Sequence, residues 1–361
     1  MSMQPFVYNS QASRVVFGVG SLSYLTREIE ALGARRALVL STPEQRRSAE
    51  QVAELIGEHC AGIFDRAVMH VPIETAREAR DVARQLHADC AIAIGGGSTT
   101  GLGKAIALES ALPILAIPTT YAGSEMTPIY GITEAGLKKT GRDIRVLPKT
   151  VIYDPELTLG LPTQLSVTSG INAMAHAAEG LYAQDANPIM SLFAEEGIRA
   201  LAHGLPKIVS SPGDIAARSK CLYGAWLCGA VLGNVGMALQ HKLCHTLGGT
   251  YNLPHAEIHT VVLPHALAYN APAVPEAIDR IARALGVGDA ARADRIERYR
   301  HAGGPTGLVR RDRYAKRVCE PTPHRKSGHT RIARRRVSRQ AAVTMSFSCA
   351  SHAYRYVGCA R

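Results

Sequence analysis

Short apolar runs alternate with amphipathic segments over the first 157 or so residues of this chain. The runs predict strands at residues 36–42, 62–64, 91–95 and 113–118, and residues 5–18 read as a β-hairpin. Apolar residues at helical spacing predict helices between them, at about 22–32, 45–56, 75–86 and 103–109. Because strands and helices alternate with short connections, we expect a mostly parallel sheet with helices on both faces.

The pattern changes near Asp154, where apolar residues begin to recur at spacings of three and four. Helices are predicted at residues 164–182, 188–205, 214–234, 238–247, 256–271 and 274–285. We therefore divide the chain into an α/β domain (residues 1–157) and an all-helical domain (158–290). A cleft between two such domains is the default position for an active site.

Residues 291–361 differ from the rest in charge and composition. They hold 18 of the 41 Lys and Arg residues but 4 of the 30 Asp and Glu residues, so the net charge of +11 belongs to this segment alone. A basic arm for nucleic acid is one interpretation. The segment has no helical or strand period, so we favour a poorly packed or artefactual C-terminus, such as a reading-frame error would produce, and expect no nucleic-acid partner.

The overall composition is that of an ordinary globular protein, with 46% hydrophobic and 20% charged residues. No apolar run approaches the length of a membrane span, and the N-terminus lacks the features of a signal peptide, so we expect a cytoplasmic protein without a membrane partner. The eight cysteines form no C-x-x-C pair, which disfavours a disulfide framework or a zinc knuckle.

A glycine-rich turn at Gly95-Gly96-Gly97 lies between a predicted strand and the next helix. Glycines let a ligand approach the backbone, and the hydroxyls of residues 98–100 lie beside the free N–H groups of the first helical turn. This arrangement favours a pyrophosphate, although the run is not the G-x-G-x-x-G fingerprint and could be only a tight connection. The following strand ends in a second hydroxyl-rich loop, residues 119–125. Both loops line one rim of the predicted sheet, where open α/β sheets bind ligands.

Histidines are unusually frequent in the helical half. Asn172 and His176 are four residues apart, as are His241 and His245, so each pair faces one side of its helix. His255 is expected in the loop after Pro254. Two helices and a loop could thus direct polar groups to one shared site, which we favour over chance packing. His259 and His265 lack that pairing, and we expect them to be structural.

Several motifs together resemble the iron-containing alcohol dehydrogenase family over about residues 5–285. They are Gly95-Gly-Gly-Ser98, Pro118-Thr-Thr-Tyr-Ala-Gly-Ser-Glu125, Val151-Ile-Tyr-Asp-Pro155, Asn172-Ala-Met-Ala-His176 and the segment from His241 to His255. The variants Thr99-Thr-Gly-Leu-Gly-Lys104, Thr127-Pro-Ile-Tyr-Gly-Ile-Thr-Glu134 and His241-Lys242 are similar to the branch of the family that reduces maleylacetate.

The resemblance implies a Rossmann-like dinucleotide-binding domain and an all-α C-terminal domain, the dehydroquinate synthase-like fold, with a nicotinamide cofactor and a homodimer. The positions expected to bind the cofactor are Thr42, Gly95, Gly96, Gly97, Ser98, Thr99, Thr119, Thr120, Ser124 and Thr127. Tyr121, Ser124 and Thr127 could contact nicotinamide or substrate, or could be structural caps. Since Thr42 stands where the family often has an Asp that would repel a 2′-phosphate, we expect NADH or NADPH to be used.

The family's metal-ligand positions fall on Asn172, His176, His241 and His255. Asn172 is neutral where the family has an Asp, so we expect that a metal is not required.

The activity implied is NAD(P)H-dependent reduction of the carbon–carbon double bond of 2-maleylacetate to 3-oxoadipate. His245 is the expected proton donor. His176, His241 and His255 are expected to donate to the enolate or a carboxylate, and Lys242 to offset the dianionic charge of the substrate. A metal-dependent alcohol dehydrogenase is the nearest alternative, and a catalytically inactive nucleotide-binding or nucleic-acid-binding protein is a more distant one.

Overall fold

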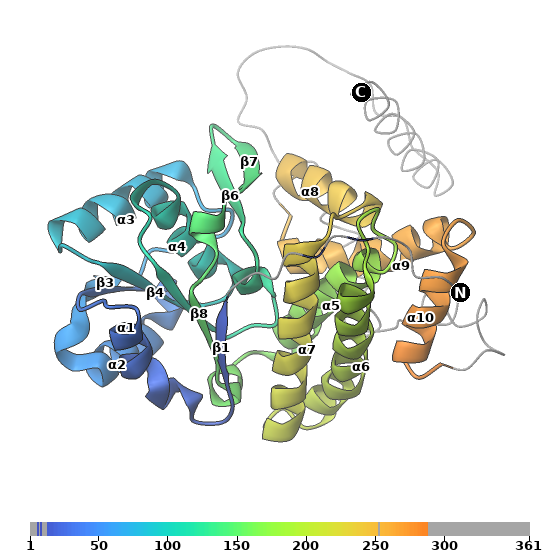
Figure 1. The fold of residues 1–361 in the computed structure, drawn as a ribbon, viewed down its shortest axis with the longest axis horizontal. Helices are drawn as coiled ribbons and strands as arrows, with labels where there is room; N and C mark the ends of the chain where they lie inside the picture. Colours follow the sequence, from blue (N-terminus) through green and yellow to red (C-terminus); the bar gives the residue numbers. More distant parts are fainter. Residues whose placement is uncertain (1–5, 7, 9–12, 252, 288–361) are drawn as a thin grey trace, which may run out of the picture. The chain divides into compact units, whose positions relative to one another are not determined.

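The N-terminal half is built on a six-stranded parallel sheet in the order β1-β8-β5-β4-β2-β3 (Figure 1). The computed structural model describes residues 6, 8, 13–251 and 253–287. The strands are β1 (Arg14–Phe17), β2 (Ala37–Leu40), β3 (Cys60–Phe64), β4 (Cys90–Gly95), β5 (Ile114–Pro118) and β8 (Thr150–Tyr153). The predicted N-terminal hairpin is wrong for residues 14–17, because β1 pairs in parallel with β8 at the sheet edge. Its other arm lies largely outside the described residues.

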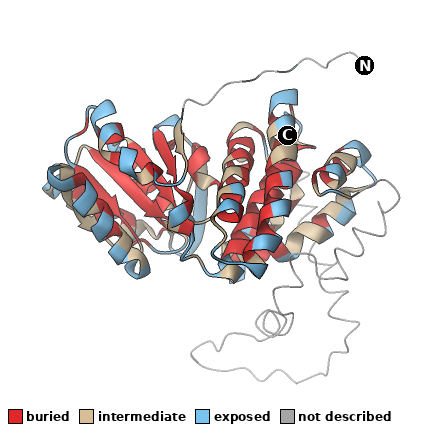
Figure 2. Cartoon of the chain, turned by 90° about the horizontal axis from the view of Figure 1, so that it is seen from below, coloured by how far each residue is buried: buried red, intermediate tan, exposed pale blue. Residues whose placement is uncertain are grey.

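Helices cover both faces of the sheet because the central strands are apolar on both sides. Val39 and Ile92 pack with α1 (Leu25–Ala31) and α2 (Arg46–Ile56), whereas Leu38 and Ala91 pack with α3 (Ile73–Gln85) and α4 (Gly97–Ser110). Alternate residues of one strand therefore serve opposite cores, which explains the continuous apolar runs in the sequence. Figure 2 shows the central strands of the sheet buried along their length.

The strand order reverses direction at β2. The chain passes from β2 to β3 on one side and then returns to place β4 and β5 on the other side. Open α/β sheets bind ligands at the carboxyl ends of the strands flanking such a reversal. Here those ends carry Thr42 and the turn Gly95–Gly97.

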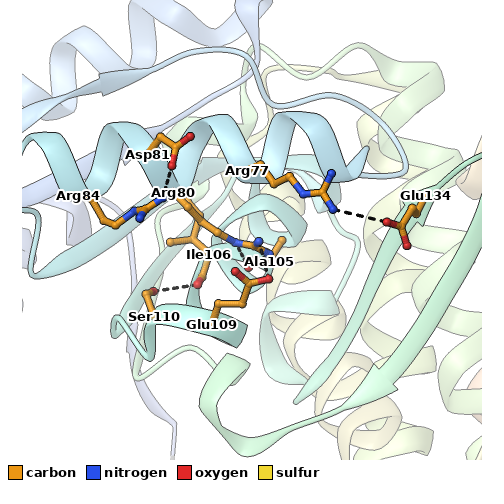
Figure 3. A network of polar contacts seen from close by, with 9 residues as sticks. All are labelled: Arg77, Arg80, Asp81, Arg84, Ala105, Ile106, Glu109, Ser110 and Glu134. Carbon is orange, nitrogen blue, oxygen red and sulfur yellow. Dashed lines mark hydrogen bonds and ion pairs between the residues drawn. The ribbon is translucent and has the colours of Figure 1, made fainter.

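A hairpin of β6 (Ile129–Glu134) and β7 (Leu137–Arg142) follows the 119–127 loop, and the sequence pattern did not predict it. Glu134 at its tip pairs with Arg77 of α3, within the polar network drawn in Figure 3. At its base, the Arg142 guanidinium donates to the carbonyl oxygen of Gly233. The hairpin is thus tied to both halves of the chain.

The second half is helical, as predicted: α5 (Thr163–Gly180), α6 (Pro188–Ser210), α7 (Ile215–Asn234), α8 (Leu239–Tyr251), α9 (His255–Asn270) and α10 (Pro275–Ala284). Helices α5, α6 and α7 bury their mutual faces. The buried guanidinium of Arg218 fixes their ends, since it donates to Ser166 Oγ at 2.8 Å and to the Pro212 carbonyl at 3.0 Å. The predicted loop around His255 is wrong, because α9 begins at this residue.

The helices pack directly against the sheet half through a glycine contact. A Cβ on Gly229 of α7 would collide with the backbone of Gly123, and Gly123 itself has a φ of +80°. Only glycine allows the 119–127 loop to approach α7 so closely. The proposed domain boundary at residue 157 lies in the short connection Pro155–Thr158 between β8 and α5, whereas the proposed third segment, 291–361, lies outside the described residues.

Among the described helices, none is by itself long and apolar enough to cross a membrane. The bent pair α7 and α8 meets the length and composition criteria only when taken together.

Candidate functional site

The turn Gly95–Gly97 begins α4 without a side-chain cap. Gly96 is the N-cap residue and no side chain bonds the first N–H groups of the helix. These groups and the positive end of the helix dipole form an anion-binding position. Ser98 and Thr99, expected beside the turn, lie in the first turn of α4, which starts earlier than the predicted residue 103.

Side chains from three other segments surround this turn at close range. A Cβ on Gly95 would lie 2.5 Å from Thr99 Oγ1 and 2.7 Å from Gln45 Oε1, and one on Gly96 would lie 3.0 Å from Thr120 Cγ2. The Gln45 amide donates to Thr119 Oγ1 at 2.8 Å. The structure therefore brings together the glycine turn and the 119–120 hydroxyls, as expected. Gln45 was missed, because nothing in the sequence relates it to residues 74 positions away.

Two hydroxyls at the turn are buried without a hydrogen-bond partner among the described residues. They are Thr99 Oγ1 and Ser124 Oγ, and the latter lies 3.9 Å from a Cβ placed on Gly97. An unpartnered buried hydroxyl is costly unless a ligand or water completes it. Both atoms therefore favour a polar ligand at this turn.

The hydroxyls of Thr127 and Tyr121 form hydrogen bonds within the protein. The Thr127 hydroxyl donates to the Ser124 carbonyl and accepts from Lys104 Nζ at 2.9 Å, so it has a structural role. The Tyr121 hydroxyl lies in the core, 3.5 Å from Thr158 Oγ1. Neither hydroxyl points to a ligand.

Lys104 holds the 119–127 loop and its continuation against α4. Its buried ammonium donates to the carbonyl oxygens of Ser124, Thr127 and Ile129 at 2.7–2.8 Å. Burial lowers the pKa of Lys104 to about 7, against a small opposing effect of Glu125. The helix that begins the glycine turn therefore also positions the second hydroxyl-rich loop.

Thr42 lies where expected, directly after β2, but it is accompanied by a carboxylate. The Glu44 backbone N–H and then the Thr42 hydroxyl donate to the Glu44 carboxylate and lower its pKa. Thr42 alone had suggested that this strand end carries no negative charge. The Glu44 carboxylate beside it supplies one.

Five imidazoles from three helices gather in the helical half. His176 comes from α5, His241 and His245 from α8, and His255 and His259 from α9. Ring centroids are 5.0 Å apart for His176 and His241, 4.7 Å for His241 and His259, and 5.9 Å for His245 and His255. The predicted shared site is therefore present in the structure as an imidazole cluster, although the roles of its members remain predictions.

His259 belongs to the cluster, although it was expected to have no partner at a spacing of four; its structural role stays a prediction. Its ring centroid is 4.5 Å from that of His255, and both its nitrogens are buried without a partner among the described residues. The signal was in the sequence: His255 and His259 are four residues apart, a pairing missed because His255 was assigned to a loop. His265 is exposed, and no ring contact joins it to the cluster in the described region.

Glu179 orients the cluster, and sequence reasoning missed it. This fully buried carboxylate accepts from His241 Nδ1 at 2.6 Å and from the backbone N–H groups of Ala238 and Gln240 at 3.0 and 2.7 Å. It therefore caps α8 and holds the proton of His241 on Nδ1. His241 Nε2 is left facing the cluster, buried and unpartnered among the residues described.

Burial keeps the inner imidazoles neutral. Desolvation, followed by the neighbouring imidazoles, lowers the pKa of His176 and of His259 well below the usual value. His245 and Lys242 lie at the exposed edge of α8. The cluster thus has neutral rings inside and the Lys242 ammonium at its rim. His245 belongs to the same edge of α8, but burial and then Lys138 lower its pKa to about 4, so its ring is also neutral near pH 7.

Among the described residues, the donor set around the cluster offers a metal neutral side chains and no free carboxylate. No three His, Cys, Asp or Glu side chains in the described part of the chain are grouped so that they could hold a metal ion. Asn172 offers a neutral amide oxygen, and the Glu179 carboxylate is occupied by His241 and α8. A divalent cation here would meet neutral donors only.

Comparisons with known proteins agree with this architecture. A family model described as iron-containing alcohol dehydrogenase matches residues 12–155, and one described as Fe-containing alcohol dehydrogenase family, C-terminal, matches residues 166–302. A maleylacetate reductase of Burkholderia cepacia is 67% identical over 309 residues, which cover 85% of this chain and 87% of that protein. One from Pseudomonas sp. strain P51 is 63% identical over 288 residues, 80% of this chain and 82% of that protein.

A solved structure of similar fold is the maleylacetate reductase from Agrobacterium tumefaciens. It is 49% identical, covers 91% of this chain and 95% of its own, and has a TM-score of 0.80. The predicted fold class, an α/β dinucleotide-binding half followed by a helical half, is confirmed.

Proposed function

Because this chain belongs to the iron-containing alcohol dehydrogenase family, we propose that it catalyses the NAD(P)H-dependent reduction of 2-maleylacetate to 3-oxoadipate. The observation that carries the proposal is the imidazole cluster, which has neutral rings and the Lys242 ammonium at its rim, in a chain similar over most of its length to proteins named maleylacetate reductase. A dianionic substrate suits such a rim.

The cofactor position is supported by the glycine turn and its surroundings. The uncapped start of α4 and the unpartnered hydroxyls of Thr99 and Ser124 are donors for a diphosphate. When bound there, the reduced nicotinamide supplies the hydride for the carbon–carbon double bond of the substrate.

The residues of the helical half meet the charge that develops on reduction. Addition of hydride to a double bond conjugated with a ketone leaves negative charge on the enolate oxygen, and the adjacent carbon must then receive a proton. We assign the proton donor to His245, which lies at the exposed edge of α8 and can exchange protons with solvent. Its pKa is lowered to about 4, mainly by burial, so in this assignment the negative charge of the bound substrate favours its protonation.

His176 and His255 donate hydrogen bonds to the enolate or a carboxylate, and Lys242 offsets substrate charge. His241 was expected to donate as well, but Glu179 holds its proton on Nδ1, which leaves Nε2 as an acceptor.

We further propose that no metal takes part in this reaction. The support is the donor set, which lacks a free carboxylate and has a neutral Asn172 in the position of the family's Asp. The chemistry above therefore rests on imidazole and ammonium groups.

The test is to follow NADH absorbance with 2-maleylacetate, with and without a chelator. We expect turnover with either nucleotide, unaffected by chelator, and a product that co-migrates with 3-oxoadipate. Stoichiometric iron or zinc in the purified protein, with loss of activity in chelator, would select a metal-dependent alcohol dehydrogenase instead. A homodimer, expected from the family resemblance, can be tested by light scattering of the same sample.

A further inference from the structure

His70 and Lys138 of the sheet half both act electrostatically on His255 of the imidazole cluster, and both are held by the hairpin β6–β7. Neither belongs to the residues considered above. We propose that Lys138 and His70 together bind a carboxylate group of the substrate and thereby select a dicarboxylate. This inference rests on the function proposed above and names a further part of the same site.

The backbone at His70 is held in an unfavourable conformation. His70 has a φ of +66° and Val71 a φ of +47°, which is rare for any residue but glycine and rarer for a β-branched one. Thr133 of β6 enforces it: its N–H donates to the Val71 carbonyl at 3.0 Å and its hydroxyl to the His70 carbonyl at 2.7 Å. Strain of this kind persists mainly where it positions a functional side chain.

The result is an imidazole with an unused donor or acceptor position. His70 Nε2 is buried and has no hydrogen-bond partner within the described residues. The pKa of His255 is lowered to about 3. Burial is the largest cause, the Lys138 ammonium comes next, and neighbouring imidazoles, His70 among them, contribute less. His70 and Lys138 are thus joined through Thr133 of the hairpin, which bonds the first and pairs with the second across the strands, and both act electrostatically on His255.

The position of Lys138 is set by the hairpin β6–β7. Lys138 pairs with Thr133 across the strands, and its Cε would lie 2.9 Å from a Cβ on Gly131, so its stem crosses a position that glycine leaves open. Its charge acts on His70, His245 and His255. In the described structure no acidic side chain pairs with it, whereas the adjacent Lys139 is bound to Glu134 at 2.6 Å.

Lys138 is exposed and has no acidic partner among the described residues, and the buried Nε2 of His70 has no hydrogen-bond partner among them, so the two groups together offer donors to an anion from outside. A carboxylate accepts from both an ammonium and a ring N–H, and charge-assisted bonds of this kind are among the stronger ones in proteins. The cofactor diphosphate is the other available anion. The glycine turn already offers a diphosphate its donors, so we assign the Lys138–His70 pair to the substrate.

The experiment compares Lys138→Gln and His70→Ala with wild type in the NADH assay, using Lys139→Gln as a matched control on the opposite face of the hairpin. We expect each of the first two variants to raise KM for maleylacetate about tenfold or more, as for loss of a charge-assisted hydrogen bond, with KM for NADH within about twofold. Lys138→Arg should recover most of the loss. An unchanged KM for maleylacetate in Lys138→Gln, or a rise only in KM for NADH, would overturn the assignment.

A binding measurement separates this inference from the proposed reaction. Calorimetry with adipate, a dicarboxylate, and hexanoate, its monocarboxylate counterpart, needs no turnover. Adipate should bind wild type more tightly than hexanoate, and Lys138→Gln should remove the difference. If wild type fails to reduce maleylacetate yet shows this preference, only the reaction is refuted. Equal binding of the two acids by wild type would refute the carboxylate site.

Discussion

The glycine turn and the imidazole cluster are built on different principles. The turn consists of backbone N–H groups and short hydroxyls, and most of its parts come from three consecutive elements, β4, α4 and the loop after β5. The cluster consists of side chains from α5, α8 and α9, and a buried carboxylate, Glu179, holds one of them in register. The first site depends on the course of the chain, and the second on how helices pack.

Because of this difference, substitutions at the two sites should affect different properties. At the turn, an added methyl group changes the shape of the backbone cradle but removes no chemistry. In the cluster, loss of one imidazole removes a proton or a donor while the helices keep their packing. Substitutions at the turn should therefore act on nucleotide binding and stability, and substitutions in the cluster on the rate of turnover.

The largest effect is expected for His245→Ala. Loss of a proton donor should lower kcat by about 100- to 10,000-fold, with KM for NADH unchanged. The control is His203→Ala, which removes an exposed imidazole of α6 that contacts only the carbonyl of Arg199 in the described structure. Full turnover by His245→Ala would show that another group supplies the proton.

Glu179→Gln should have the next largest effect. The amide keeps the shape but loses the charge that holds the His241 proton on Nδ1, so kcat should fall by about 10- to 100-fold, by analogy with other partners that orient a histidine. Melting temperature should fall as well, because α8 loses its charged cap. Glu196→Gln on the surface of α6 is the control. A variant with wild-type kcat would mean that the orientation of His241 is immaterial.

Gly95→Ala tests the other side of the comparison. Gly95 has a φ of +149°, and a methyl group there would lie 2.5 Å from Thr99 Oγ1. We expect a loss of about 1–3 kcal/mol in unfolding free energy from backbone strain, and a raised KM for NADH with kcat at saturation changed less. Gly160→Ala, where nothing lies within 4 Å, should change neither. Unaltered nucleotide binding in Gly95→Ala would argue against the turn as the diphosphate site.

Lys104→Met tests how the turn is joined to the 119–127 loop through pH. The pKa of Lys104 is lowered to about 7 in the folded chain, so above that pH the unfolded chain retains a proton that the folded chain releases. Wild type should therefore gain stability relative to Lys104→Met between pH 7 and pH 10, by at most about 1.4 kcal/mol per pH unit. Denaturant unfolding of both proteins at pH 7 and pH 9 measures this; a constant difference would contradict it.

The parts of the molecule that sequence reasoning predicted are those encoded over short distances. The glycine turn needs only a strand, three glycines and a helix start, all within residues 90–110. Two pairs of the cluster follow from i, i+4 spacing on α5 and α8. The polar β6–β7 hairpin has no apolar alternation strong enough to mark it as strand, since β7 is exposed along nearly its whole length.

The parts that were missed depend on contacts between distant residues. Gln45 reaches the turn only because β2 and β4 are neighbours, and Glu179 reaches α8 across 62 residues. The place of His259 in the cluster was not predicted, because Pro254 was assigned to a loop, whereas it is the N-cap of α9. The sequence pattern predicted most helices and strands, but it did not predict contacts between distant residues or the exact ends of helices.

The smallest effect is expected at the end of β2, where Thr42 alone had suggested that NADPH can be used beside NADH. If the adenosine ribose binds at this strand end, as proposed, a 2′-phosphate would bring a second negative charge near the Glu44 carboxylate, which accepts from the Thr42 hydroxyl. Glu44→Gln should therefore raise kcat/KM for NADPH a fewfold relative to NADH, an effect limited by solvent screening of an exposed carboxylate. Glu50→Gln on α2 is the matched control, because its carboxylate faces Arg46. If kcat/KM for NADPH relative to NADH is unchanged in Glu44→Gln, the adenosine ribose does not bind at this strand end. The proposal of a diphosphate at the glycine turn would not be affected by that result.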